Sequence, residues 1–206
     1  MFRVDLHVHT TFSGDSTISP KTVVEKLNAH PTVKGVAITD HDTTEGYFKV
    51  HRLADAYTDL VIIPGIEVRT ERGDIIILGV DEEPEQPNTL RSTLNFAAET
   101  HGVVLIPHPY RSPGIGDFAL NMRSDAIEVF NPTATPKENM MAQRLAEAGQ
   151  LPRVAGTDAH SADEMGIAFT EVEAQPNAES ILEAIRNGLV KPVYSEKQSL
   201  RWHDFL

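Results

Sequence analysis

The stretch Phe2-Arg3-Val4-Asp5-Leu6-His7-Val8-His9 alternates apolar and polar side chains and ends in two histidines. Successive side chains of a strand point to opposite faces, so Asp5, His7 and His9 are expected on one face. The apolar residues Phe2, Val4, Leu6 and Val8 are expected on the other face, packed on helices. Two histidines at i and i+2 can reach one metal ion. This stretch therefore predicts a strand of a buried sheet that carries a metal site at its carboxyl end.

The same pattern, an apolar run followed by ionisable residues, recurs along the chain. Further strands are predicted over 35–39, from 60 onward, and over 103–106, 126–130, 153–156 and 169–173. A hairpin is predicted between 68 and 80, with residues 71–74 as its turn, and helices are predicted from 20 and over 44–57, 88–99, 136–148 and 178–187. This alternation predicts an α/β fold with a parallel sheet, which either an open doubly wound sheet or a closed barrel satisfies. No linker or repeat interrupts it, so residues 1–206 are expected to form a single domain.

Chemistry-bearing residues follow nearly every predicted strand. Five of the nine histidines lie there, His7, His9, His41, His108 and His160, and they are joined by Asp40, Glu67, Asn131 and Asp158. The carboxyl ends of parallel strands gather on one face, where active sites form. Carboxylates buried together there need compensating cations, so the pattern predicts bound metal. The remaining histidines, His30, His51, His101 and His203, lie in or beside helices or in the C-terminal tail and are not expected to bind metal.

Composition narrows the kind of site and of partner. The chain has no cysteine, which excludes thiolate ligands, a cysteine nucleophile and disulfides. Its formal net charge of −12 argues against binding long nucleic acid, although bound metals still allow a small phosphorylated substrate. There is neither a signal peptide nor an apolar run of membrane-spanning length, so no membrane contact and a cytoplasmic location are expected.

Taken together and in this order, the motifs resemble those of the PHP family, named for polymerase and histidinol phosphatase. The matching segments are 5–10 (Asp-Leu-His-Val-His-Thr), 39–41 (Thr-Asp-His), 107–109 (Pro-His-Pro) and 156–160 (Gly-Thr-Asp-Ala-His). The resemblance spans Asp5 to about Gly166 and implies a distorted β/α barrel of seven strands, similar to a TIM barrel. It also implies two or three metal ions at the carboxyl-terminal mouth of that barrel.

Carried over position by position, the resemblance assigns ligands to each ion. His7, His9, Glu67 and Asp158 would surround the first, Glu67 and His108 would share the second, and Asp15, His41 and His160 would hold the third. Many members of the family have a histidine where this chain has Asn131. Asparagine is a weaker, neutral ligand, so Asn131 would bind the second ion loosely or leave that position to water.

The resemblance implies a phosphoric ester hydrolase, either a phosphomonoesterase or a phosphodiesterase, in which metal-activated water attacks phosphorus. Arg111 is the candidate for clamping the phosphate, because its planar guanidinium matches phosphate oxygens. Asp40 and Asp5 are expected to orient ligand histidines. Imidazole and carboxylate ligands suit manganese, zinc or iron.

Three other functions compete with this one. An amidohydrolase barrel also begins with His-x-His, but such sites often need a lysine at a strand end, and none of the seven lysines follows an apolar strand run. A non-catalytic regulatory or polymerase-accessory module would have lost several metal ligands, whereas this chain differs from the family's ligand set at one position, Asn131. A nuclease acting on long DNA or RNA would carry a basic, aromatic-rich patch, which the sequence lacks.

Overall fold

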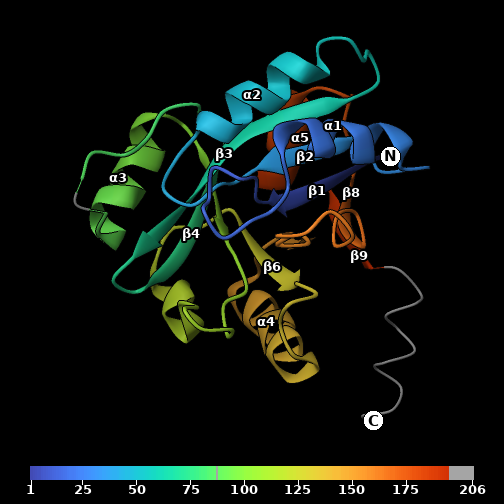
Figure 1. Ribbon diagram of the computed structural model, residues 1–206. Coiled ribbons are helices and arrows are strands. Elements are labelled where there is room, and N and C mark those ends of the chain that lie inside the picture. The colour runs from blue at the N-terminus through green and yellow to red at the C-terminus, as the bar shows by residue number, and fades with distance from the viewer. Residues whose placement is uncertain (87, 195–206) are drawn as a thin grey trace.

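The computed structural model describes residues 1–86 and 88–194, and its nine strands form one sheet in the order β7-β6-β5-β4-β3-β2-β1-β8-β9. The strands are β1 (Phe2–Val8), β2 (Gly35–Ile38), β3 (Val61–Thr70), β4 (Gly73–Leu78), β5 (Val103–Ile106), β6 (Ala126–Phe130), β7 (Arg153–Ala155), β8 (Ala168–Val172) and β9 (Val190–Tyr194). The α-helices are α1 (Pro20–Ala29), α2 (Glu45–Ala54), α3 (Leu90–Glu99), α4 (Pro136–Gly149) and α5 (Ala178–Arg186), with a 3₁₀ helix, η1, at Gly116–Asn121. Figure 1 shows α1 and α2 covering β1 to β3, with α3 beside β4 and α4 beside β6.

The first seven strands curl into a nearly closed barrel, which confirms the predicted TIM-like α/β fold. Closure occurs just after β7, where Ala159 forms a parallel bridge with Val8 and its carbonyl accepts the backbone N–H of His9 at 3.1 Å. Two features depart from regular β/α repetition: β4 runs antiparallel to both neighbours, and β8 pairs antiparallel with β1. Because β4 is reversed, its first residues lie at the same end of the barrel as the last residues of the parallel strands.

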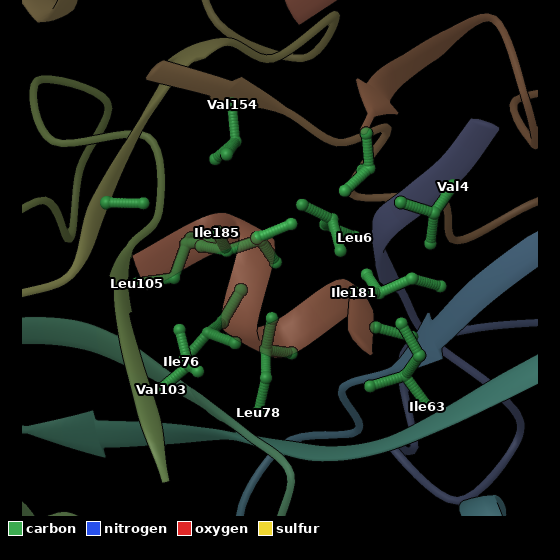
Figure 2. Close-up of a cluster of buried hydrophobic side chains, with 14 of the residues drawn as sticks. Val4, Leu6, Ile63, Ile76, Leu78, Val103, Leu105, Val154, Ile181 and Ile185 are labelled. Carbon is green, nitrogen blue, oxygen red and sulfur yellow. The ribbon is translucent and has the colours of Figure 1, made fainter. Parts of the chain in front are cut away.

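An apolar cluster fills the opposite end of the barrel. Inward-facing residues of the strands, among them Leu6, Ile63, Ile76 and Leu105, pack against Ile181 and Ile185 of α5 (Figure 2). Alternation along the strands separates this interior from the outer core: Ile76 belongs to the inner cluster, whereas Ile75 and Ile77 pack with α3 and α4 residues. α5 thus plugs one end, and the polar site occupies the other.

The helices begin where capping residues satisfy their first backbone N–H groups. Ser19 accepts from the backbone N–H of Thr22, with Pro20 at the first helical position as the sequence indicated. Thr135 and Glu138 form a reciprocal capping box at the start of α4. None of the helices within the described ranges is long and apolar enough to cross a bilayer.

The structure corrects the predicted faces of β1. Val4 and Leu6 belong to the inner cluster, but Val8 packs outside with α1 residues such as Val23 and Val24. The reason is a register irregularity between Asp5 and Val8, which interrupts the alternation. As a result the carboxylate of Asp5 accepts from Thr157 and Gly166, not from a histidine ring.

One further expectation needs amendment, and two elements were not expected. Residues 71–74 were expected to be a turn, but Gly73 and Asp74 already belong to β4. Neither η1 nor β9 was expected from the sequence. Residue 87 and residues 195–206, including His203, lie outside the described ranges.

Candidate metal centre

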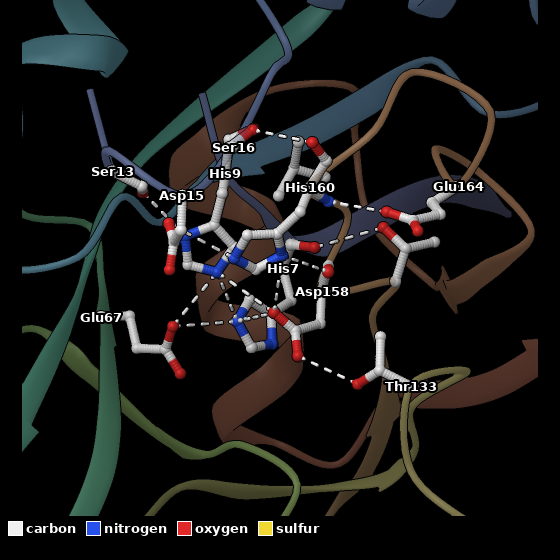
Figure 3. A network of polar contacts seen from close by, with 12 residues as sticks. His7, His9, Ser13, Asp15, Ser16, Glu67, Thr133, Asp158, His160 and Glu164 are labelled. Carbon is white, nitrogen blue, oxygen red and sulfur yellow. Dashed lines mark hydrogen bonds and ion pairs between the residues drawn. The ribbon is translucent and has the colours of Figure 1, made fainter. Parts of the chain in front are cut away.

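Four buried side chains point at one another at the mouth of the barrel: His7 from β1, His9 directly after it, Glu67 from β3 and Asp158 just after β7 (Figure 3). The Nε2 atom of His7 lies 3.3 Å from Glu67 Oε2 and 3.4 Å from Asp158 Oδ1. The Nε2 atom of His9 lies 3.1 Å and 3.2 Å from the same two oxygens. The two Nε2 atoms are 3.1 Å apart. Ligands about 2.0 Å from a tetrahedral ion are separated by about 3.3 Å, so these four atoms fit the coordination sphere of one metal.

The hydrogen bonds of the two rings determine which nitrogen of each ring faces the other ligands. Nδ1 of His7 lies 3.1 Å from Glu128 Oε1, and the carboxylate can only accept, so Nδ1 carries the hydrogen. Nδ1 of His9 lies 3.0 Å from Ser13 Oγ. Ser13 donates its one hydrogen to Asp40 at 2.7 Å, so it must accept from His9.

In both rings Nδ1 is taken up by a contact behind the ring, so Nε2 is the nitrogen that faces the cluster, and the two Nε2 atoms lie 3.1 Å apart. Hydrogens on these nitrogens are shared with Glu67 and Asp158, and a bound metal ion would take their place. This arrangement is what a metal requires of neutral imidazole ligands, with carboxylate and hydroxyl partners setting ring orientation from behind. The described residues thus fit a divalent ion on an observation independent of any sequence motif.

The electrostatics of the cluster give the same result. Burial disfavours the charged form of His7, but Asp158, Glu67 and Glu128 outweigh it and raise its pKa well above the ordinary value. The pKa of His9 rises to about 9, because hydrogen bonds to Asp158 and Glu67 outweigh burial. Burial would raise the pKa values of Glu67 and Asp158, yet the histidines hold both well below their ordinary range. The buried carboxylates therefore attract positive charge strongly, and a dication meets that demand.

A second group lies beside the first, toward solvent. Ring nitrogens of His9, His41 and His160 lie close enough to share an ion. Nε2 of His41 is 3.4 Å from Asp15 and Nε2 of His160 is 3.6 Å from it, and the Asp15 side chain is 55 % exposed. Nδ1 of His160 donates to the carbonyl of Asp158 at 2.9 Å, which leaves Nε2 as the ligating nitrogen. The structure thus brings together the three residues expected around a third ion.

The loop that carries His160 is held from several sides. The carboxylate of Glu164 accepts the backbone N–H groups of His160 and Ser161, both at 2.8 Å. The carbonyl of His160 accepts from Ser16 Oγ at 3.3 Å and from the backbone N–H of Thr17 at 2.9 Å. The loops after β1 and β7 are therefore tied together, which sets the spacing of their ligands.

A third group contains Glu67, His108 and Asp74, whose ligand atoms lie within 4.8 Å of one another. Nε2 of His108 is 3.2 Å from Glu67 Oε1, so Glu67 turns one oxygen to His7 and His9 and the other to His108. Asp74 was missed, because its stretch was interpreted as a turn. A signal was present: Asp74 stands two residues before Ile76, on the inward face of β4. Burial, reinforced by Glu67, raises the pKa of Asp74 to about 6.

Arg111 and Asn131 also lie at this centre. A guanidinium nitrogen of Arg111 donates to Asp158 Oδ2, which brings the predicted phosphate clamp to the metal ligands. Asn131 is fully buried, and its Nδ2 donates to Glu128 at 2.9 Å and to Asp158 at 3.4 Å. Its ligand role stays a prediction.

Asp40 and Asp5 lie farther from the rings than expected. Asp40 accepts from Thr10 N at 2.6 Å and from Ser13 Oγ at 2.7 Å, so it reaches His9 only through Ser13. Asp5 accepts from Thr157 Oγ1 at 2.6 Å and organises the loop that carries Asp158. The groups that touch the rings, Ser13 and Glu128, were not assigned this role from the sequence.

Strained backbone marks two ligand positions. His108 has φ = 24° and Asp158 has φ = 53°, both in the left-handed region that non-glycine residues rarely adopt. Gly156 is needed nearby, because a Cβ there would lie 2.6 Å from the Cβ of His7 and 2.7 Å from Glu128 Oε1. Of the histidines not expected to bind metal, His30, His51 and His101 belong to none of the three groups.

Comparison with known proteins identifies a family. A family model described as PHP domain matches residues 5–111, just over half of the chain, and one described as PHP-associated matches residues 136–190. The uncharacterised protein MJ1587 of Methanocaldococcus jannaschii is 32 % identical over 142 residues, which cover 63 % of this chain and 81 % of that protein.

Solved structures share the fold at low identity. A two-domain protein from Bacteroides vulgatus, whose description includes a predicted PHP-like metal-dependent phosphoesterase, superposes with a TM-score of 0.80 at 16 % identity. The match covers 95 % of this chain and 65 % of that protein. An amidohydrolase from Chromobacterium violaceum, solved with bound sulfate, gives a TM-score of 0.69 at 15 % identity, covering 95 % of this chain and 99 % of that one.

Proposed function

Because this chain belongs to the PHP domain family, whose members are metal-dependent, we propose that it hydrolyses small phosphate esters with a metal-activated water. The observation that carries the proposal is the pair of His7 and His9 Nε2 atoms, 3.1 Å apart and flanked by Glu67 and Asp158. The structural neighbour from Bacteroides vulgatus, described as PHP-like and phosphoesterase-containing, supports the same reaction class.

Two or three divalent ions, manganese, zinc or iron, would be held by the three groups of ligands. His7, His9, Glu67 and Asp158 would hold one, Glu67 and His108 another, and Asp15, His41 and His160 a third. The nitrogen and oxygen donors suit all three metals. When bound, these ions supply Lewis acidity and lower the pKa of coordinated water.

The side chains around the ligands have separate tasks in this reaction. Glu128 and Ser13 keep the Nδ1 hydrogens of His7 and His9 pointing away from the substrate. Asp40 anchors Ser13, and Asp5 anchors the loop at Thr157. These contacts hold the ligand atoms in place, so that little reorganisation accompanies the reaction.

Arg111 would bind the phosphate of the substrate. Its guanidinium lies on Asp158 at the edge of the site, its side chain is 30 % exposed, and its buried Nε has no hydrogen-bond partner among the described residues. A phosphate oxygen at this place would accept from Arg111 in the manner that a guanidinium favours. The substrate would be a nucleotide, a short oligonucleotide or a phosphorylated metabolite, since the net charge of −12 disfavours long nucleic acid.

The test is phosphate release from a panel of phosphomonoesters, phosphodiesters and short oligonucleotides. The as-purified protein, the protein with added Mn²⁺, and the chelated protein are compared, with His9→Ala as the site variant and His51→Ala, an exposed histidine of α2, as its control. Chelator-sensitive release that His9→Ala abolishes and His51→Ala retains would support the proposal. Release that survives both chelation and His9→Ala would refute it.

Amide hydrolysis is the second candidate, favoured by the fold shared with the amidohydrolase from Chromobacterium violaceum. Against it, every lysine within the described residues is partly or fully exposed, so none is buried at the centre as a bridge between metals. Hydrolysis of cyclic amides without phosphate release would support this candidate. Metal binding without either activity would favour a non-catalytic regulatory or polymerase-accessory module.

A further inference from the structure

Asp74 is a mostly buried residue whose carboxylate receives no hydrogen bond from the described part of the chain. The residue is 4 % exposed, and its backbone N–H donates to the carbonyl of Pro113 at 3.1 Å. Within residues 1–86 and 88–194, no donor contacts its side-chain oxygens. An unpaired buried carboxylate is costly unless a cation compensates it.

The position of β4 directs this carboxylate to the metal centre. Glu67 pairs with Ile76 in the β3–β4 register, and Ile76 faces the barrel interior. Asp74, two residues earlier on the same strand, faces the same way but nearer the mouth. Its ligand atom lies within 4.8 Å of those of Glu67 and His108, and two ligands on opposite sides of one ion are about 4 Å apart.

Asn131, the residue expected beside Glu67 and His108, has no oxygen left to offer. Its Oδ1 already accepts two hydrogen bonds from Thr133, from the backbone N–H at 2.9 Å and from Oγ1 at 2.7 Å. The side of the amide that faces Asp158 and Glu128 is the Nδ2 group, which donates and cannot ligate. Asn131 therefore ties these carboxylates together, and the second ion lacks a ligand from this position.

We propose that Asp74 supplies that ligand, so that Glu67, His108 and Asp74 hold a divalent ion next to the one held by His7 and His9. The second metal site is completed from the reversed strand β4 instead of from the end of β6. Glu67 bridges the two ions through its two oxygens, which already face the two ligand groups. The inference rests on the metal dependence of the proposed function but on no particular substrate.

The experiment counts bound ions. The full chain and its variants are dialysed to equilibrium against the same free Mn²⁺ concentrations, and bound manganese is measured by inductively coupled plasma mass spectrometry. Asp74→Asn preserves the shape of the side chain, Asn131→Ala removes the competing candidate, and Asp81→Asn, an exposed carboxylate after β4, is the matched control. Asp74→Asn should bind one ion fewer than the wild type, or need at least ten-fold more free Mn²⁺ to fill that site. Asn131→Ala and Asp81→Asn should bind the wild-type number.

Electron paramagnetic resonance gives a second readout that needs no substrate. Two Mn²⁺ ions bridged by Glu67 should give a spin-coupled spectrum in the wild type, and Asp74→Asn should give that of isolated Mn²⁺. The inference is overturned if Asp74→Asn binds manganese with wild-type number and affinity, or if Asn131→Ala alone loses an ion. Circular dichroism checks each fold, and Asp74→Ser replaces Asp74→Asn in both measurements if the asparagine variant does not fold. Because ions are counted, failure to hydrolyse any phosphate ester would leave this test intact.

Discussion

Glu128 on β6 accepts from Nδ1 of His7 on β1 at 3.1 Å, although the two residues are 121 positions apart in the chain. The contact orients the ring and directs its Nε2 toward Glu67 and Asp158. The same carboxylate accepts the backbone N–H of His108 at 2.8 Å, so it positions ligands of two groups at once.

Glu128→Ala should weaken binding of the tightest metal ion by about 10- to 100-fold, the usual effect of removing the partner behind a histidine ligand. Metal affinity falls because the His7 ring is no longer held in place and its Nε2 becomes less basic. Isothermal titration with Zn²⁺ measures it. Glu173→Ala, at an exposed position beyond β8, should keep wild-type affinity. Equal affinities for Glu128→Ala and the wild type would mean that packing alone orients His7.

Metal should stabilise the folded chain strongly. Free metal at 100 times its dissociation constant contributes about 2.7 kcal/mol per site, which corresponds to a rise in Tm of roughly 5–10 °C for a chain of this length. Differential scanning fluorimetry with chelator and with added Mn²⁺ measures the rise. His9→Ala should remove most of it, because His9 contributes to two of the ligand groups, whereas His51→Ala should keep it. An unchanged Tm in the wild type would contradict the metal assignment.

Arg111→Ala should lower kcat/KM for a phosphate ester by roughly 10- to 100-fold, since a hydrogen bond to a charged group contributes about 1.5–3 kcal/mol. Arg111→Lys keeps the charge without the planar fork of donors, so its kcat/KM should lie between those of the wild type and Arg111→Ala. Arg91→Ala, at an exposed position on α3, serves as the control. Metal affinity should not fall in Arg111→Ala, because Asp158 is then freed for the ion. If metal affinity fell together with kcat/KM, Arg111 would instead be needed to keep the metal centre intact.

Gly156→Ala should disrupt the centre although residue 156 is no ligand. The added methyl would lie 2.6 Å from the Cβ of His7 and 2.7 Å from Glu128 Oε1, so it would push these two side chains apart. Bound metal after dialysis should fall, and the Tm of the chelated protein should fall too. In Gly149→Ala the methyl meets only ends of leucine side chains, at 3.0 Å and 3.1 Å, and metal binding should stay unchanged. Full metal content in Gly156→Ala would show that β1 and β7 can separate slightly.

Much of the centre could be predicted because its residues follow recognisable apolar runs. His7, His9, His108 and Asp158 stand at or just after the ends of parallel strands, and parallel strands place their carboxyl ends together. Glu67 lies within β3 and not at its end; the strand pattern singled it out, and the resemblance to a known family assigned its ligand role. The barrel itself followed from the strand–helix alternation together with that resemblance.

What escaped prediction depends on contacts between distant segments. The irregularity in β1 that turns Asp5 away from the site leaves no mark in an alternating sequence. The role of Glu128 requires knowing that β6 comes to lie two strands from β1 when the barrel closes after β7. Asp74 was taken for a turn residue because Gly-Asp commonly forms turns, whereas here the strand begins at Gly73.

The pairing of β1 with β8 has a consequence for how the chain folds during synthesis. Phe2 lies opposite Val172 in the sheet, so one edge of the first strand stays open until the chain has grown by about 170 residues. At translation rates of about 5–20 residues per second, that exposure lasts roughly ten to thirty seconds. Asp158 is likewise synthesised about 150 residues after His7 and His9, so the metal centre forms only when the last barrel strands pack against the first. Contacts of such long sequence separation make the closing step the slow one in folding.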